Sequence, residues 1–170
     1  MYLVTTPVFD QENFSEKKIY ISELAKKKIH DESNNTKVLE YHWKDINDAK
    51  KDSKYIYDFI NELLLSLSDE LNRYHKTKYE LKYWKVLINP WLYYFLTKYY
   101  EHYLSCINAI DKIDEFSSSL SDQYYIPSTY YGFNSISSSN EYTSIIFQEI
   151  LNYLSQTRNI KKKISKNFFD

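Results

Sequence analysis

The hydrophobic pattern changes its period near residue 45, and this change most constrains the fold. Before it lie three short runs rich in β-branched and aromatic residues: YLVTT (2–6), KIYIS (18–22) and KVLEY (37–41). The segment between the last two runs has room for one or two helical turns. A strand, a short helix and a second strand make a βαβ unit with parallel strands. We therefore predict an α/β fold in which residues 1–44 form a small parallel sheet.

Helical periodicity begins at about residue 45. Apolar residues then recur at spacings of three and four, which is typical of one face of a long helix. That stripe consists of Ile56, Phe59, Ile60, Leu63, Leu64, Leu67, Leu71 and Tyr74. Asp45 or Asp52 could cap the start of this helix. Residues 45–112 are predicted to form the helical part of the chain.

A second apolar stripe keeps its helical phase through an Asn-Pro pair. It consists of Trp84, Leu87, Ile88, Trp91, Leu92, Phe95, Leu96, Tyr99, Tyr103 and Ile107. Asn89 and Pro90 are a good N-cap and first helical residue, and proline disfavours helical geometry at the residue before it. We therefore predict two helices, 79–88 and 90–112, that meet at a break or kink.

The rest of the chain is predicted to form a loop, a helix and a tail. Residues 113–139 are rich in serine and form a long loop of the kind that is usually functional or mobile. Residues 140–160 carry an apolar stripe, with Asn140 as the candidate cap. Residues 161–170 are a basic tail. We predict that all of these parts belong to one domain, residues 1–170.

Composition excludes several kinds of chemistry. The chain has a single glycine, Gly132, whereas phosphate-binding loops need several glycines for tight turns and close backbone approach. We therefore predict no bound cofactor. The four histidines lack metal-ligand spacing, and the lone Cys106 is expected to be a buried helix residue, so no metal site is predicted. A net charge of −1 provides no field that would attract nucleic acid, and no such partner is predicted.

The sequence favours a cytoplasmic location. Met1 leads directly into YLVTTP, without the charged and apolar regions of a signal peptide. The longest apolar run, VLINPWLYYFL, is shorter than the roughly 20 residues that a spanning helix needs. Lys161, Lys162 and Lys163 form one basic cluster, which could make a weak contact with a membrane surface or lie on a solvated helix end. A location at the periphery of the inner membrane is compatible with this cluster.

Several motifs occur in an order that resembles a known family. They are LVTTP (3–7), EYHW (40–43), LNRYH (71–75), LKYWKVLINPWLYYF (81–95), YEHYLS (100–105) and YYIPSTYYGFN (124–134). Over nearly its whole length the chain resembles the N-terminal part of a family of sugar-transferase-like proteins encoded among bacterial O-antigen and surface-polysaccharide genes. The tryptophan-proline-tryptophan block is the most specific part. Lys85 and Asn89 depart from the family pattern, which has arginine and glycine there.

The resemblance implies a fold and a function. The fold would be a Rossmann-like domain, the N-terminal half of a two-domain GT-B-type glycosyltransferase of lipopolysaccharide, O-antigen or surface-polysaccharide biosynthesis. This half would contribute the acceptor side of the cleft, and the donor would bind to a C-terminal domain that lies outside these 170 residues. A nucleotide-sugar donor and a glycan or lipid-linked acceptor are then partners only together with that domain. The chain alone is not expected to be catalytically complete.

One group of candidate site residues follows from the rule that ligands bind beyond the carboxyl ends of parallel strands. Thr5 and Thr6 after the first strand, and Trp43 after the third, are predicted to bind substrate. Glu23 and His42 are the candidate catalytic bases, since each can exchange a proton near neutral pH in a suitable environment. The alternatives are a solvated carboxylate at a helix start for Glu23 and a loop histidine bonded to backbone for His42.

A second group of predicted substrate-binding residues surrounds the tryptophan block: His75, Tyr83, Trp84 and Lys85. Lys85 could pair with a phosphate of the donor or of a lipid carrier, and is otherwise an exposed lysine. His75 ends a helix, where a cation also suits the helix dipole. Trp84 shares a helical face with Trp91, which favours a place in the core over a platform for sugar stacking.

A different class of function is a non-catalytic α/β module. Such a module would bind a partner protein through the aromatic helix face between Tyr79 and Phe95. This alternative predicts a stable complex in which those aromatic side chains are buried, whereas the transferase interpretation predicts that a sugar or its acceptor binds at the sheet.

Overall fold

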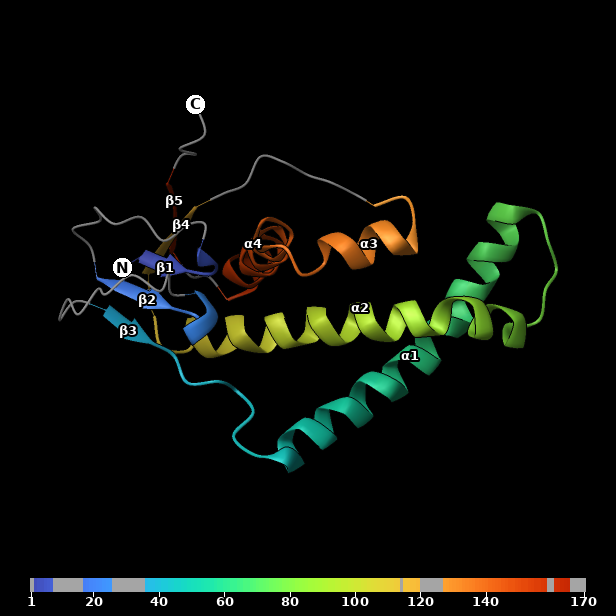
Figure 1. Cartoon of the computed structure of the whole chain (residues 1–170), viewed down its shortest axis with the longest axis horizontal. Coiled ribbons are helices and arrows are strands. Elements are labelled where there is room, and N and C mark those ends of the chain that lie inside the picture. Colours follow the sequence, from blue (N-terminus) through green and yellow to red (C-terminus); the bar gives the residue numbers. More distant parts are fainter. Residues whose placement is uncertain are drawn as a thin grey trace. The chain divides into compact units, whose positions relative to one another are not determined.

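The computed structural model describes residues 2–7, 17–25, 36–113, 115–119, 127–158 and 161–165 (Figure 1). Three strands come first, β1 (Tyr2–Val4), β2 (Lys18–Tyr20) and β3 (Thr36–Val38), with a short 3-10 helix, η2 (Glu23–Ala25), after β2. Two long helices follow, α1 (Ile46–His75) and α2 (Leu81–Ile110). The order ends with β4 (Glu115–Ser119), α3 (Tyr130–Ile136), α4 (Asn140–Thr157) and β5 (Lys161–Ser165). The fold is α/β, as predicted.

The five strands form one parallel sheet in the order β3-β2-β1-β4-β5. Leu3 of β1 pairs with Ile19 of β2, and Ile19 in turn lies opposite Lys37 of β3. On its other side β1 pairs with β4, where Tyr2 lies opposite Ser117. Every residue of β1 and β2 is buried, as is usual for inner strands of a parallel sheet. The prediction of three parallel N-terminal strands is confirmed.

Three elements lie where the sequence predicted none. β4 and α3 fall within the predicted loop 113–139, and β5 falls within the predicted basic tail 161–170. β4 and β5 pair with each other over five residues. Both strands are rich in serine or lysine and lack the apolar alternation that identifies a strand in a sequence. Their extended form therefore depends on their neighbours in the sheet more than on their own propensity.

The chain divides into two compact units. Unit 1 comprises residues 1–42 and 102–170 and contains the sheet, the end of α2, α3 and α4. Unit 2 comprises residues 43–101, which are α1 and most of α2. Because α2 contributes to both units, one helix links two separately packed cores.

The start of α1 is set by its cap. Asp45 is the N-cap, and its carboxylate accepts hydrogen bonds from the backbone N–H groups of Asn47 (2.6 Å) and Asp48 (3.2 Å). These bonds satisfy N–H groups that have no partner within the helix. Of the two caps proposed from the sequence, Asp45 is confirmed.

The end of α1 requires a left-handed residue. Lys76 has a φ of 55°, and within the described part of the chain it is the one non-glycine residue with a positive φ. The N–H groups of Lys76 and Thr77 bond back to the carbonyls of Arg73 and Asn72, which is a common way to end a helix. Glycine usually occupies such a position, so the turn into α2 forms here without one.

Helix α2 is continuous, so the predicted break at Asn89–Pro90 is wrong. Proline inside a helix removes one backbone hydrogen bond and crowds the carbonyl four residues earlier, at a cost of about 3 kcal/mol. Ile88, Trp91 and Leu92, from both sides of Pro90, nevertheless pack on the same core. Burial of the shared stripe on both sides of Pro90 offsets the lost hydrogen bond.

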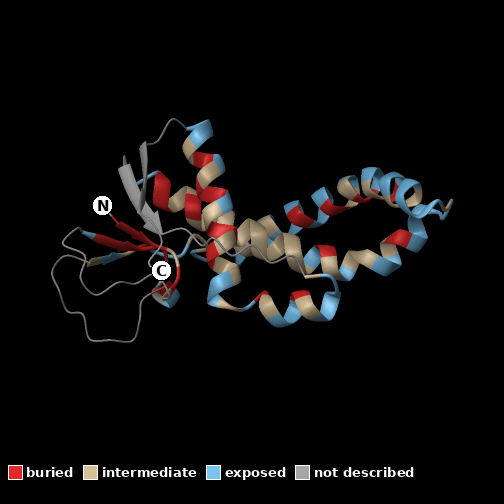
Figure 2. Ribbon diagram, turned by 90° about the horizontal axis from the view of Figure 1, so that it is seen from above, coloured by how far each residue is buried: buried red, intermediate tan, exposed pale blue. Residues whose placement is uncertain are grey.

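The core of unit 2 lies between α1 and α2 (Figure 2). Ile56, Ile60 and Leu64 of α1 and Leu92 of α2 form its buried centre. Partly buried apolar side chains pack around them: Leu63, Leu67, Ile88, Trp91, Leu96 and Tyr100. The predicted stripe of α1 is thus confirmed at its centre. It is wrong at Phe59, which is 43% exposed and stacks on Tyr55, and at Tyr74, which is 82% exposed because the helix ends there. The predicted stripe of α2 is likewise wrong at Leu87, which is 59% exposed.

In unit 1, α4 packs against the end of α2. Its N-cap is Ser139, whose hydroxyl accepts from the N–H of Tyr142, so the predicted cap Asn140 is one residue too late. The ring of Phe147 lies 4.5 Å from that of His102 on α2. The buried face of α4 consists of Ser144, Ile146, Phe147, Ile150, Leu151 and Leu154. Among the helices described, none carries an apolar stretch long enough to cross a bilayer.

Candidate functional site

The strand order creates a topological switch point between β1 and β4. From β1 the sheet continues to β2 and β3 on one side, and to β4 and β5 on the other. In open α/β sheets, ligands bind beyond the carboxyl ends of the strands at such a point. Thr5 and Thr6 follow β1 directly. The carboxyl edge of the sheet at β1 is therefore the candidate functional site.

Thr6 has an unusual environment for a hydroxyl group. The residue is 2% exposed, its Oγ1 is buried, and no described residue supplies a hydrogen-bond partner for that oxygen. Leaving a buried hydroxyl without a partner costs roughly 1–3 kcal/mol. Such groups are rare in native proteins and call for a specific explanation. Of the two threonines, Thr5 is half-buried, so Thr6 is the stronger candidate for a polar contact with a bound group.

His42 lies beyond the end of β3, where contacts with α2 hold the chain in place. Its Nδ1 is 3.3 Å from the hydroxyl oxygen of Ser105, and its ring centroid lies 4.4 Å from that of Tyr41. The side-chain amide of Asn108 donates to the carbonyl of Glu40 at 2.9 Å. These contacts hold the imidazole against Tyr41 and Ser105, while the backbone of His42 follows the carboxyl end of β3. The role of His42 as a base stays a prediction.

Glu23 begins η2, shortly after the end of β2. The backbone therefore places it near the carboxyl edge of the sheet, as the sequence predicted. Its side chain lies outside the described residues, and so do residues 26–35, where the rest of the predicted helical segment falls. The proposed catalytic role of Glu23 stays a prediction.

Trp43 is separated from the second group of predicted residues by the length of α1. Its indole N–H donates to the carboxylate of Asp52 at 2.7 Å, near the start of that helix. His75 is the last residue of the same 30-residue helix, which is about 45 Å long at 1.5 Å per residue. Trp43 and His75 therefore do not line one sugar-sized site within unit 2. Asp52 holds this tryptophan and does not cap the helix.

Asn72 organises the turn between α1 and α2. Its side-chain oxygen accepts hydrogen bonds from the N–H of Tyr79 (2.9 Å), the hydroxyl of Thr77 (3.0 Å) and the indole N–H of Trp84 (3.1 Å). Its amide group donates to the carbonyl of Tyr79 at 2.9 Å. Sequence reasoning missed this residue, because a single polar residue near a helix end carries no periodic signal. Side-chain hydrogen bonds thus fix the turn.

Trp84 is a core residue of unit 2. It is 4% exposed, and the ring of His75 stacks on it with centroids 5.7 Å apart. Tyr83 is 45% exposed and stacks on Tyr79, with centroids 4.1 Å apart. A buried indole whose N–H is already bonded fits the core interpretation of Trp84. The substrate-binding roles of these residues stay predictions.

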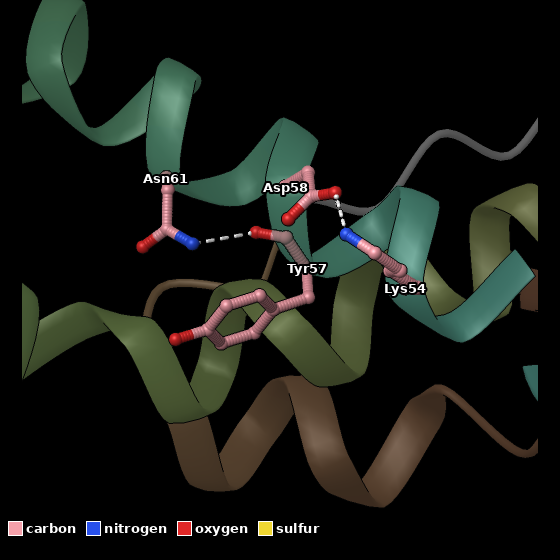
Figure 3. Close-up of polar contacts among 4 residues, drawn as sticks. All are labelled: Lys54, Tyr57, Asp58 and Asn61. Atoms are coloured by element: carbon pink, nitrogen blue, oxygen red, sulfur yellow. Dashed lines mark hydrogen bonds and ion pairs between the residues drawn. The ribbon is translucent and has the colours of Figure 1, made fainter. Parts of the chain in front are cut away.

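Lys85 contacts α1. Its ammonium group donates to the side-chain oxygen of Asn61 at 3.0 Å. The amide of Asn61 in turn donates to the carbonyl of Tyr57 at 2.9 Å, and one turn earlier Lys54 pairs with Asp58 at 2.7 Å (Figure 3). The hydrogen bond to Asp58 raises the pKa of Lys54. The half-buried Lys85 therefore links the two helices, and its pairing with a phosphate stays a prediction.

Cys106 is fully buried on α2 in unit 1. Burial disfavours the thiolate and raises the pKa of the Cys106 thiol well above its ordinary value. A neutral buried thiol is a poor nucleophile, so the expectation of a buried helix residue is confirmed. Within the described residues, no group of three or more His, Cys, Asp or Glu residues is placed to hold a metal ion.

The parallel strand order and its switch point define the chain as an α/β protein with an open parallel sheet, a class in which ligands bind at the carboxyl edge of the sheet. The sequence profile described as LIC12162 family transferase matches residues 1–168. The chain belongs to this family, and the predicted resemblance to a transferase family is confirmed. No curated protein and no solved structure matches the chain.

Proposed function

We propose that this chain is the acceptor-side domain of a sugar transferase of O-antigen or other surface-polysaccharide biosynthesis. Family membership supports the transferase class. The buried Thr6 hydroxyl at the switch point, which has no partner among the described residues, is the observation that supports this location for the acceptor site. A sugar acceptor offers hydroxyl groups that can both donate and accept, and one of them would satisfy Thr6. The acceptor therefore binds at the carboxyl edge of β1 in this proposal.

The single glycine supports the assignment of the donor to another domain. Gly132 lies in the first turn of α3, and its N–H donates to the cap hydroxyl of Thr129 at 3.0 Å. A Cβ at position 132 would lie 3.1 Å from that oxygen, so this glycine serves the helix cap. No glycine remains in the 170 residues for a loop that wraps a diphosphate. In the proposal, a second glycine-containing domain or subunit of a GT-B-type enzyme binds the nucleotide sugar.

His42 is the proposed base at this edge. In the transfer step, the acceptor oxygen forms a bond to the anomeric carbon of the donor while the nucleoside diphosphate leaves with the bonding electrons. His42 accepts the proton of the acceptor hydroxyl. Ser105, 3.3 Å from Nδ1, positions the ring. Support for this role is the location of His42 beyond the end of β3.

A binding experiment with one matched pair of variants tests this proposal. Saturation-transfer NMR with the purified chain should detect binding of acceptor glycans but not of nucleotide sugars. Thr6→Val removes the hydroxyl and keeps the shape, so the acceptor signal should be lost. Thr97→Val is the control, because Thr97 on α2 has a second buried hydroxyl with no partner among the described residues.

Stability separates a binding effect from misfolding. Neither substitution breaks a hydrogen bond with a described residue, so both variants should retain the unfolding free energy of the original chain or gain about 1 kcal/mol. Urea unfolding measures this value. The proposal fails if Thr6→Val binds acceptor as well as the original chain does, or if nucleotide sugars bind to the isolated chain.

A further inference from the structure

The start of α2 carries an exposed apolar face in unit 2. Its apolar side chains are 45–73% exposed, and they come from the end of the preceding turn and the first two turns of the helix: Tyr79, Tyr83, Val86 and Leu87. Together with Glu80 and Lys82 they line a shallow groove of about 610 Å³. Clusters of exposed apolar side chains on one face mark interaction sites more often than single exposed residues do. We call these six residues the tip patch.

The surroundings of the tip patch are basic. Residues 74–87 contain four lysines, Lys76, Lys78, Lys82 and Lys85, and one acidic residue, Glu80, which gives this segment a formal charge of +3. The whole chain has a net charge of −1. The first three of these lysines are exposed, whereas Lys85 is half-buried. The exposed apolar face therefore lies in a positively charged segment, although the rest of the chain carries a net negative charge.

The tip patch is presented on a preformed turn. The four hydrogen bonds of Asn72 fix the connection between the helices. Trp84 is buried beneath the patch residues of the same helix, and the ring of Tyr83 meets it edge-on, with centroids 5.1 Å apart. A partner that binds the patch therefore does not have to order the backbone first, which lowers the entropic cost of binding.

We propose that the tip patch docks unit 2 onto an anionic lipid bilayer. Tyrosine side chains place an apolar ring and a polar hydroxyl at the level of lipid headgroups. Val86 and Leu87, 73% and 59% exposed, provide side chains that can enter the boundary of the acyl region. Lysine stems lie along apolar surface while the ammonium groups reach lipid phosphates. Charge complementarity favours an anionic bilayer as the occupant.

Vesicle sedimentation with the full chain tests this inference without any sugar substrate, so its outcome is independent of the proposed transferase function. The chain should bind vesicles that contain phosphatidylglycerol, bind phosphatidylcholine vesicles weakly, and be released by salt. Lys78→Gln with Lys82→Gln should lower the partition constant about 30-fold, since each lysine near such a surface contributes about 1 kcal/mol. Leu87→Ser should lower it about tenfold through lost apolar burial.

Matched variants control for general effects of charge and polarity. Lys50→Gln with Lys51→Gln removes two exposed lysines near the other end of α1. Leu65→Ser changes a leucine that is 57% exposed, close to the 59% of Leu87. Both controls should bind vesicles like the original chain. All of the substituted residues are exposed, so circular dichroism should show unchanged folding.

Three results would overturn the inference. The first is binding that does not depend on phosphatidylglycerol. The second is unchanged binding of the Lys78→Gln, Lys82→Gln variant, which would move the contact elsewhere, for example to Lys161–Lys163. The third is a concentration-dependent dimer in sedimentation velocity that Leu87→Ser abolishes, which would assign the tip patch to a protein interface.

Discussion

The two units differ in how far along the chain their contacts reach. In unit 1, the sheet depends on pairs such as Tyr2 with Ser117, which lie 115 residues apart in the sequence. In unit 2, the 30-residue helix α1 and most of α2, joined by a five-residue turn, pack on each other. The difference extends to function. The sheet buries a hydroxyl that lacks a partner among the described residues, whereas the hairpin exposes apolar side chains. Ligand chemistry is therefore proposed for unit 1 and surface attachment for unit 2.

The largest expected effect separates the two cores. Leu64→Ala removes a side chain that is 1% exposed in the centre of unit 2 and should lower the free energy of unfolding by about 3 kcal/mol. Hydrogen exchange should accelerate at the amides of residues 43–101 more than in unit 1. The control is Leu65→Ala at the adjacent residue, 57% exposed, which should change stability by less than about 0.5 kcal/mol. Equal acceleration in both units would show that they open together.

A smaller effect of opposite sign is expected at Pro90, inside the helix that both units share. Pro90→Ala restores a backbone N–H and should raise the free energy of unfolding by roughly 1–3 kcal/mol. Urea unfolding followed by circular dichroism measures the change. Asn89→Ala, at the neighbouring residue, should change stability by less than about 1 kcal/mol. A loss of stability in Pro90→Ala would mean that the hairpin needs a local distortion there.

The smallest expected effect is a pH dependence confined to unit 1. The folded state raises the pKa of the Cys106 thiol above its unfolded value of about 8.5. The contribution of the neutral thiol is therefore complete below about pH 8.5 and declines above it, by at most about 1.4 kcal/mol per pH unit. Unfolding free energies measured between pH 7 and 10 should show this decline. Cys106→Ala should lack that component, and an identical pH profile for both chains would contradict the assignment.

Periodicity was sufficient to predict most of unit 2 from the sequence. The buried centre of α1, at Ile56, Ile60 and Leu64, follows from spacings of three and four. The continuity of α2 was not predicted from the sequence. Proline locally disfavours a continuous helix, but packing of the residues on both sides of Pro90 on one core outweighs this preference. Asn72 was also missed, since its role depends on partners up to twelve residues away that a turn brings together.

The strands of unit 1 were predictable where they contain β-branched and aromatic residues. β1, β2 and β3 were found in this way, and the rule for parallel sheets then placed Thr6 at the carboxyl edge. β4 and β5 were not found, because their polar residues become strands through pairing with distant parts of the chain. The contact between Ser105 and His42 depends on that same long-range arrangement.

The left-handed backbone at Lys76 has a consequence for how this chain can change over evolutionary time. A side chain in that conformation costs roughly 1 kcal/mol, which glycine would avoid. Yet Lys76 is also one of the exposed lysines that flank the tip patch. A change of Lys76 to glycine would make the turn easier to form and would also remove one positive charge from the surface. The residue found at this position therefore indicates whether selection favours the stability of the turn or the basic surface.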